Sequence, residues 1–313
     1  MIDEQLLGTI LALFAAVCWG VGASLYKIVL KSEHSLFLTI TIRGSIAVPF
    51  IAIVTFFVNN FYSLEILFSP EVLPILIFSS IFVGFGDLWF FGSLQRIEIT
   101  KAMPVASIYP LFTAILLIIF GLETISLVVL IGIIILIAGL GFLAQENKSS
   151  SSNLESQEEM KMGLALAVLA ALFWSFAIYT LRLLLDYPDV DVYSLATVRF
   201  GILTFFFGIF WIINTLYRHQ TGIVDPASLS HITKKVSFIL GLGGILSWGI
   251  GGISFFSSIE MIGAGRATPI SSINPLISVI IGILVLKEKI SPLQAVGILL
   301  IIFGSIFVSI LEL

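Results

Sequence analysis

The sequence predicts an all-α integral membrane protein in which ten transmembrane helices form two inverted-topology repeats of five. Two observations predict this class. First, 58% of the 313 residues are hydrophobic and 11% are charged, whereas about 25% of the residues in a soluble domain are charged. Second, one ordered set of residues occurs in both halves of the chain. A globular fold of this size has too little interior to hide so much apolar surface, so lipid must cover it.

Ten apolar runs are long enough to cross a bilayer, since a helix needs about 20 apolar residues to span the hydrocarbon core. They lie at 6–30, 36–58, 72–93, 102–120, 126–144, 162–184, 193–213, 236–257, 267–286 and 292–311. Residues 145–161, rich in Ser and Glu, form a polar linker. The linker divides the chain into a first five-helix repeat, 1–144, and a second, 162–313.

The two halves match in sequence. When residues 93–142 are laid on 258–307, eighteen of the fifty positions are identical. The informative matches are the residues other than Ile and Leu, among them Pro104 with Pro269, Ser107 with Ser272, Pro110 with Pro275 and Glu123 with Glu288. Because five is odd, the second copy must enter the membrane from the opposite face. Inverted repeats of this kind build many secondary transporters.

Four short patterns occur in the same order in both halves. They are AAVCWG at 15–20 and AALFWS at 170–175, TIRG at 41–44 and TVRF at 197–200, AMPVASIYPL at 102–111 and ATPISSINPL at 267–276, and GLETIS at 121–126 and LKEKIS at 286–291. This set resembles the drug/metabolite transporter superfamily, specifically its ten-helix carriers built from two EamA domains. The resemblance implies a carrier for small metabolites, amino acids or drugs that works without ATP.

We therefore expect a secondary transporter in the cell membrane that moves amino acids or related metabolites by alternating access through a central cavity. The resemblance favours export. The expected partners are a small-molecule solute and the lipid bilayer, and the internal duplication removes the need for a dimer. Proton coupling would use Asp87, and a facilitator without protons is the near alternative. The alternative from another functional class is a sensor or structural membrane protein that has the carrier fold but does not carry out the transport cycle.

Charge, cysteine and histidine content exclude several other functions. The net charge of −4 leaves no basic surplus to hold nucleic acid. A single cysteine, Cys18, cannot form an intramolecular disulfide. The three histidines lie far apart in connecting segments, at His34, His219 and His231. We therefore expect no metal or other cofactor. With no histidine inside a span to activate a serine, we also expect no catalytic residues and no enzyme.

Two prolines in each of two matching spans are candidate helix breaks: Pro104 and Pro110, and Pro269 and Pro275. Each proline removes a backbone donor and frees a carbonyl. Lipid tolerates this only where protein or a water-filled cavity satisfies the freed group. Interrupted helices at corresponding places in two halves mark the binding site of many carriers. A kink that serves packing alone is the other interpretation.

Polar and aromatic residues in the spans are candidates for solute binding. Tyr109 and Asn274 occupy equivalent positions on two polar stripes, which should face protein or water. Trp19 and Trp174 lie near mid-span, where an indole N–H needs a partner. The complete candidate set is Trp19, Ser107, Tyr109, Trp174, Arg199, Ser272 and Asn274. Helix–helix hydrogen bonding and core packing are the alternative roles.

Ionisable residues inside a span are costly and suggest function. Arg43 and Asp87 lie at the same depth, about 10 Å from one membrane face, so we expect them to pair as a coupling or gating element. When the two halves are aligned, Gly252 stands at the position equivalent to Asp87, so Arg199 has no carboxylate equivalent to the one that Arg43 meets. Arg199 could then snorkel, reach Glu260 or meet a solute anion.

Basic residues predict the orientation of the chain. Eleven of the fifteen follow odd-numbered helices, and only Arg182 and Arg266 lie on the opposite side. The positive-inside rule then places both termini outside the cytoplasm, although the family resemblance suggests cytoplasmic termini.

A reporter active only in the cytoplasm tests this orientation. Fused after Leu313 it should be silent, and inserted at Ser151 it should be active, because the charge count puts the linker inside. The opposite pattern would contradict the charge-based orientation.

Overall fold

The computed structural model describes residues 3–30, 35–122, 127–143, 154–221 and 232–310, and helices are the only regular elements within these ranges. Eight helical segments of this part of the chain are long and apolar enough to cross a membrane. They are α1 (Glu4–Val29), α2 (Leu36–Asn59), α4 (Leu73–Arg96), α5 with α6 (Ile99–Ile119), α8 (Leu154–Leu185), α9 (Val192–Thr221), α10 through α11 (Lys234–Ile262), and α12 with α13 (Ala264–Leu284).

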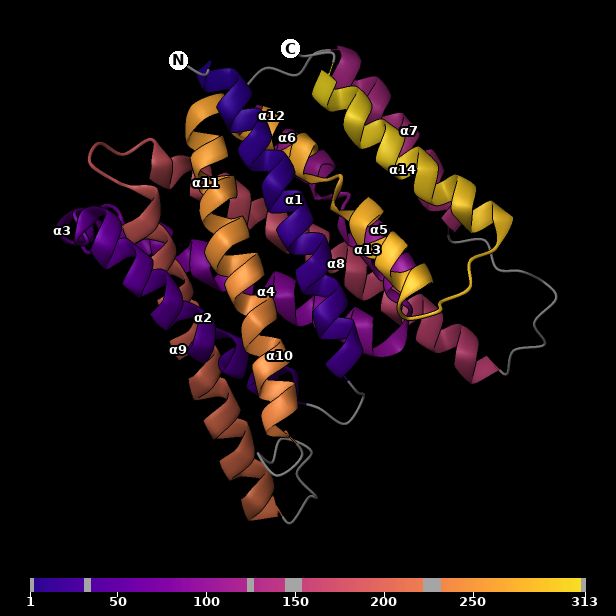
Figure 1. Ribbon diagram of the computed structural model, residues 1–313, viewed down its shortest axis with the longest axis horizontal. Helices are drawn as coiled ribbons and strands as arrows, with labels where there is room; N and C mark the ends of the chain where they lie inside the picture. Colours follow the sequence, from indigo (N-terminus) through magenta and orange to yellow (C-terminus); the bar gives the residue numbers. More distant parts are fainter. Residues whose placement is uncertain (1–2, 31–34, 123–126, 144–153, 222–231, 311–313) are drawn as a thin grey trace.

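Two further apolar helices, α7 (Leu127–Leu143) and α14 (Pro292–Ile310), pack against each other at one edge of the bundle (Figure 1). A short helix, α3 (Leu64–Leu67), follows α2. The start of α1 and the end of α14 lie on the same side of the molecule (Figure 1).

The main helix contacts join the two halves of the chain. Helix α4 packs along α8, α2 along α9, and α1 along α11. Each pair contains one helix that ends before residue 144 and one that begins after residue 153. Polar side chains on the inner faces of these helices therefore meet between the halves.

Helix α8 begins earlier than the sequence predicted. We expected the sixth span to start at residue 162, but the helix starts at Leu154 and takes in the last part of the predicted linker. Residues 154–161 read LESQEEMK and contain mostly strong helix formers, so the polar end continues the apolar helix. Glu159 in this extension pairs with Arg96 at 3.3 Å. Residues 144–153 of the predicted linker lie outside the described residues.

Two matching spans are broken near the predicted prolines. Two residues separate α5 (Ile99–Ala106) from α6 (Tyr109–Ile119), and two residues separate α12 (Ala264–Ser271) from α13 (Asn274–Leu284). Pro110 and Pro275 lie in the first turns of α6 and α13, where a missing N–H costs nothing. Ser272 Oγ donates to the carbonyl of Pro269 at 2.6 Å, which supplies a partner within the break.

The acidic residue of the LKEKIS pattern caps the first half of one broken helix. The Glu288 carboxylate accepts hydrogen bonds from the backbone N–H groups of Ile99 and Thr100, each at 3.0 Å. A negative charge at a helix N-terminus satisfies free donors and complements the helix dipole. The second half of the chain thereby holds α5 of the first half. The matching Glu123 lies outside the described residues.

A second polar cluster joins the halves at the start of α9. Asp191 accepts hydrogen bonds from the backbone N–H groups of Tyr193 and Ser194, both at 2.9 Å, and from the side chains of Asn59 and Ser63. Partial burial raises the pKa of Asp191, but the hydrogen bonds from Ser63, Ser194 and Asn59 outweigh this effect and hold it below its usual value. The cluster ties the α2–α3 connection to the N-terminus of α9.

Candidate functional site

A cavity of about 120 Å³ lies between the two halves of the chain. Pockets for drug-sized ligands measure roughly 300–1,000 Å³, so this cavity suits a smaller solute. Seven of the residues predicted from the sequence line it, namely Trp19, Arg43, Asp87, Tyr109, Trp174, Arg199 and Asn274. The lining is otherwise mostly aromatic and aliphatic. Ser107 and Ser272 are buried beside the helix breaks rather than in the lining.

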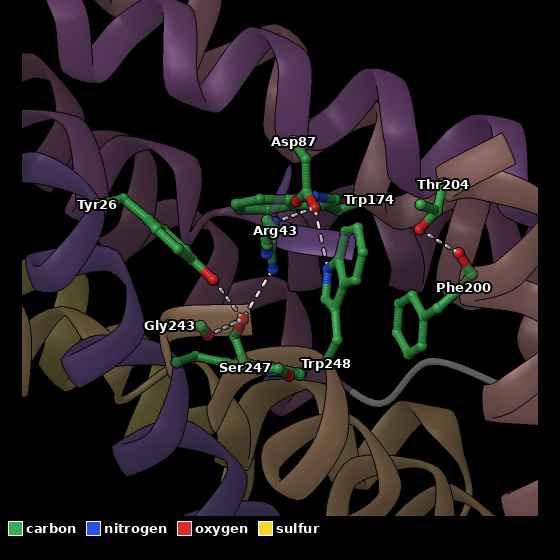
Figure 2. A network of polar contacts seen from close by, with 10 residues as sticks. Tyr26, Arg43, Asp87, Trp174, Phe200, Thr204, Gly243, Ser247 and Trp248 are labelled. Atoms are coloured by element: carbon green, nitrogen blue, oxygen red, sulfur yellow. Dashed lines mark hydrogen bonds and ion pairs between the residues drawn. The ribbon is translucent and has the colours of Figure 1, made fainter. Parts of the chain in front are cut away.

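The structure brings Arg43 and Asp87 together. Arg43 Nη1 lies 2.6 Å from Asp87 Oδ2, and the two residues are only 3% and 5% exposed. The carboxylate also accepts hydrogen bonds from two indoles, Trp174 Nε1 to Oδ1 and Trp248 Nε1 to Oδ2, each at 3.1 Å (Figure 2). Three donors on three helical segments therefore stabilise one buried negative charge.

The other side of the Arg43 guanidinium contacts the second half of the chain. Its Nη2 donates to Ser247 Oγ at 2.7 Å, and the same hydroxyl lies 2.8 Å from the Tyr26 hydroxyl (Figure 2). The guanidinium also lies 4.0 Å from the centre of the Trp248 ring, a favourable cation–π distance. It lies 4.8 Å from the centre of the Tyr26 ring as well, so Arg43 links α2 to α4, to α1 and to the segment that carries Ser247 and Trp248.

Two glycines permit these close approaches. A Cβ at Gly86 would lie 2.3 Å from Cδ1 of Trp174, and a Cβ at Gly243 would lie 2.4 Å from Cε1 of Tyr26. Both distances are far inside van der Waals contact. Glycine at these positions lets the two rings pack directly on the helix backbones beside Asp87 and Ser247.

Sequence reasoning did not assign Tyr26, Ser247 or Trp248 to the site. Ser247 and Trp248 lie in a π-helical turn, Ile245–Ile250 (η2), between α10 (Lys234–Gly244) and α11 (Gly251–Ile262). π-Helical turns are rare in proteins, and those that occur are frequently found at functional sites. The available signal was Trp248 itself, because an indole N–H in the middle of a span requires a buried acceptor.

The polar residues at the helix breaks bind one another across the halves. Ser107 Oγ donates to Asn274 Oδ1 at 2.7 Å, and the Tyr109 hydroxyl lies 2.8 Å from Ser271 Oγ. Tyr109 and Asn274 also line the cavity. These two residues therefore hold helices together and face the cavity, so their geometry fits both roles considered from the sequence.

Arg199 is buried in the cavity wall and does not snorkel. It is 3% exposed, and its Nη2 donates to the carbonyl oxygen of Ala177 at 3.0 Å. Its Nε has no hydrogen-bond partner. Among the described residues, none of the ion pairs includes Arg199, so the alternative of a contact with Glu260 is not realised. Of the three roles that the sequence suggested for Arg199, contact with a solute anion is the one that this geometry fits.

The chain also matches known proteins over almost its whole length. The model of the EamA-like transporter family matches residues 6–145 and 161–310, one match in each half. The chain belongs to the EamA-like transporter family. With eight apolar helices of membrane-spanning length among its described residues, it is a multi-pass membrane protein of a transporter family.

Individual relatives are similar at lower identity. An uncharacterized transporter of Archaeoglobus fulgidus is 26% identical over 301 residues, covering 96% of each chain. A protein of Listeria innocua, provisionally named for sugar uptake, is 27% identical over 78% of this chain and 82% of its own. One solved crystal structure superposes with a TM-score of 0.64 at 16% identity, over 97% of this chain and 96% of that one, and shows the shared fold.

A double-mutant cycle tests whether Arg43 and Asp87 act as a pair. Removing one partner from a buried ion pair leaves the other uncompensated, so Asp87→Asn and Arg43→Gln should each lower the free energy of unfolding by about 3–5 kcal/mol. The double variant should lose less than the sum, as measured by unfolding in detergent. Additive losses would show that the two residues do not interact.

Proposed function

We propose that this EamA-family protein is a secondary transporter that moves amino acids or related small metabolites across the cell membrane by alternating access. In this proposal ten helices form two inverted five-helix repeats, and a monomer suffices. The protein is not an enzyme. The direction that we expect is export, on the family resemblance alone. The cavity between the halves, lined by equivalent residues from both, is the observation that carries the proposal.

Alternating access needs a site that both halves build and that can open to either side. Trp19 and Trp174, which match each other in the repeat, both line the cavity, as do Tyr109 and Asn274. The breaks in the α5–α6 and α12–α13 spans lie beside the second pair. These features support solute binding at the cavity by Trp19, Tyr109, Trp174, Asn274 and the nearby serines.

Proton coupling would act through Asp87. Protonation of Asp87 removes the negative charge that holds Arg43, and an unpaired buried guanidinium favours hydration of that side of the cavity. The pair would then serve as a gate on the face from which α2 starts. A facilitator without protons is the alternative, and a sensor that binds solute without moving it is the alternative from another class.

Sugar is a second candidate substrate class. Two relatives from Listeria are named for sugar uptake at 27% identity. Trp19, Trp174 and Trp248 line the cavity and offer flat apolar faces beside the polar Arg43 and Asp87. This combination suits the apolar faces and hydroxyl groups of a sugar ring. Uptake rather than export would then be the direction.

Flux into and out of proteoliposomes tests transport directly. Thermal stabilisation first selects solutes from radiolabelled amino acids and sugars, and flux of each is then measured at several pH values. Tyr109→Leu and Asn274→Leu should each weaken solute binding by about tenfold. Asp87→Asn should remove the pH dependence of flux.

Phe57→Leu provides the matched control, because Phe57 is 80% exposed on the outer surface. A solute that binds but is not moved would favour the sensor. If Tyr109→Leu and Asn274→Leu bind normally but unfold at lower temperature, these residues serve packing alone and the solute site lies elsewhere.

A further inference from the structure

The second half of the chain contains a copy of the Arg43–Asp87 site that lacks the carboxylate. The segment FVGFGDLWFF at 82–91 aligns with SWGIGGISFF at 247–256. Four identities fix this register, Gly84 with Gly249, Gly86 with Gly251, Phe90 with Phe255 and Phe91 with Phe256. Asp87 then falls on Gly252, between matched residues on both sides.

The two arginines occupy equivalent places in the structure. The guanidinium carbon of Arg43 lies 5.5 Å from the centre of the Phe91 ring. That of Arg199 lies 5.2 Å from the ring of Phe256, the counterpart of Phe91. Because Gly252 and Phe256 are four residues apart on α11, they share one helix face. Arg199 therefore meets α11 as Arg43 meets α4.

The two tryptophans are equivalent as well. The Trp174 ring packs on Phe90 with centroids 5.2 Å apart, and the Trp19 ring packs on Phe255 at 4.8 Å. Trp174 donates its N–H to Asp87, whereas Trp19 donates to the carbonyl oxygen of Ser247 at 2.9 Å.

The vacant position lies next to the acceptor that Trp19 uses. A Cβ built at Gly252 would lie 3.5 Å from the Ser247 carbonyl oxygen. Gly252 also lines the cavity, as do Trp19 and Arg199. The space that a carboxylate side chain would occupy therefore opens into the cavity.

The charges around the cavity do not balance. Two arginines and one aspartate line it, so the ionised side chains in its lining sum to one positive charge. Asp87 is already bound by Arg43 and two indoles, and Arg199 keeps an unpartnered Nε. A buried cation without a counter-ion is costly. An anion in the cavity would remove that cost.

We propose that a carboxylate of the transported solute takes the place of the missing side chain at Gly252, where it binds Arg199 beside the indole of Trp19. The substrate class is then a small organic carboxylate, such as an amino acid or a sugar acid, rather than a neutral sugar. This inference rests on the proposed transport function and specifies its substrate.

Restoring the carboxylate tests the position without any solute. The Cβ of Gly252→Asp and that of Gly252→Asn would each lie 3.3 Å from the ring edge of Phe200, so this close contact affects both variants equally and cancels when they are compared. Since the new charge pairs with Arg199, Gly252→Asp should melt at least about 3 °C above the isosteric Gly252→Asn. The difference should vanish in an Arg199→Gln background. No difference between Asp and Asn at this position would overturn the proposal.

Matched probes test the substrate class. Binding of benzoate and benzamide, phenylalanine and its amide, and glucuronate and glucose is measured by thermal stabilisation. In any pair that binds, the probe with the carboxylate should bind wild-type protein about tenfold more tightly than the partner that lacks it. Gly252→Asp and Gly252→Asn should both weaken binding of the carboxylate, because either side chain fills the space that the solute carboxylate takes. Arg199→Gln leaves that space open and should abolish the preference by removing the cation.

A probe without a carboxylate that binds as tightly as its carboxylate partner would also overturn the proposal. If no probe binds, the melting difference between Gly252→Asp and Gly252→Asn decides alone. Flux in proteoliposomes is measured separately, so the two proposals can fail independently. Carboxylates that bind at Arg199 but are not moved would refute the transport function and leave the binding site standing.

Discussion

The Asp87 carboxylate is the group on which the arrangement of the cavity depends. Lipid offers no hydrogen bonds, so a buried charge must find every partner within the protein. Asp87 on α4 finds Arg43 on α2, Trp174 on α8 and Trp248 in the π-helical turn. One side chain thereby connects two helices of its own half to two elements of the other. A movement that separates the halves must break or exchange these bonds.

Much of this architecture could be predicted because its causes are local or periodic. Apolar runs predict membrane-spanning helices, and the paired prolines predict the two interrupted spans. The depth of Arg43 and Asp87 predicts that they meet, since each costs too much alone in lipid. The early start of α8 was missed because helix propensity extends the span beyond its apolar part.

The rest of the site depends on packing that no local pattern encodes. The π-helical turn that presents Ser247 and Trp248 arises from how α10 and α11 join, and its sequence ILSWGI contains no marker of the extra residue. Tyr26 reaches Ser247 only because Gly243 leaves room for its ring. Such contacts depend on the distance between helices that are far apart in the chain.

Alternating access is the central claim, and cysteine accessibility tests it most directly. Cys18 is the single cysteine, so a Cys18→Ala background isolates an introduced thiol at Ala23, which lines the cavity and is 3% exposed. In oriented vesicles, a membrane-impermeant maleimide should modify Ala23→Cys from either face, and should leave Ile53→Cys on the outer surface unmodified. Modification of Ala23→Cys from one face only, or from neither, would contradict alternating access through this cavity.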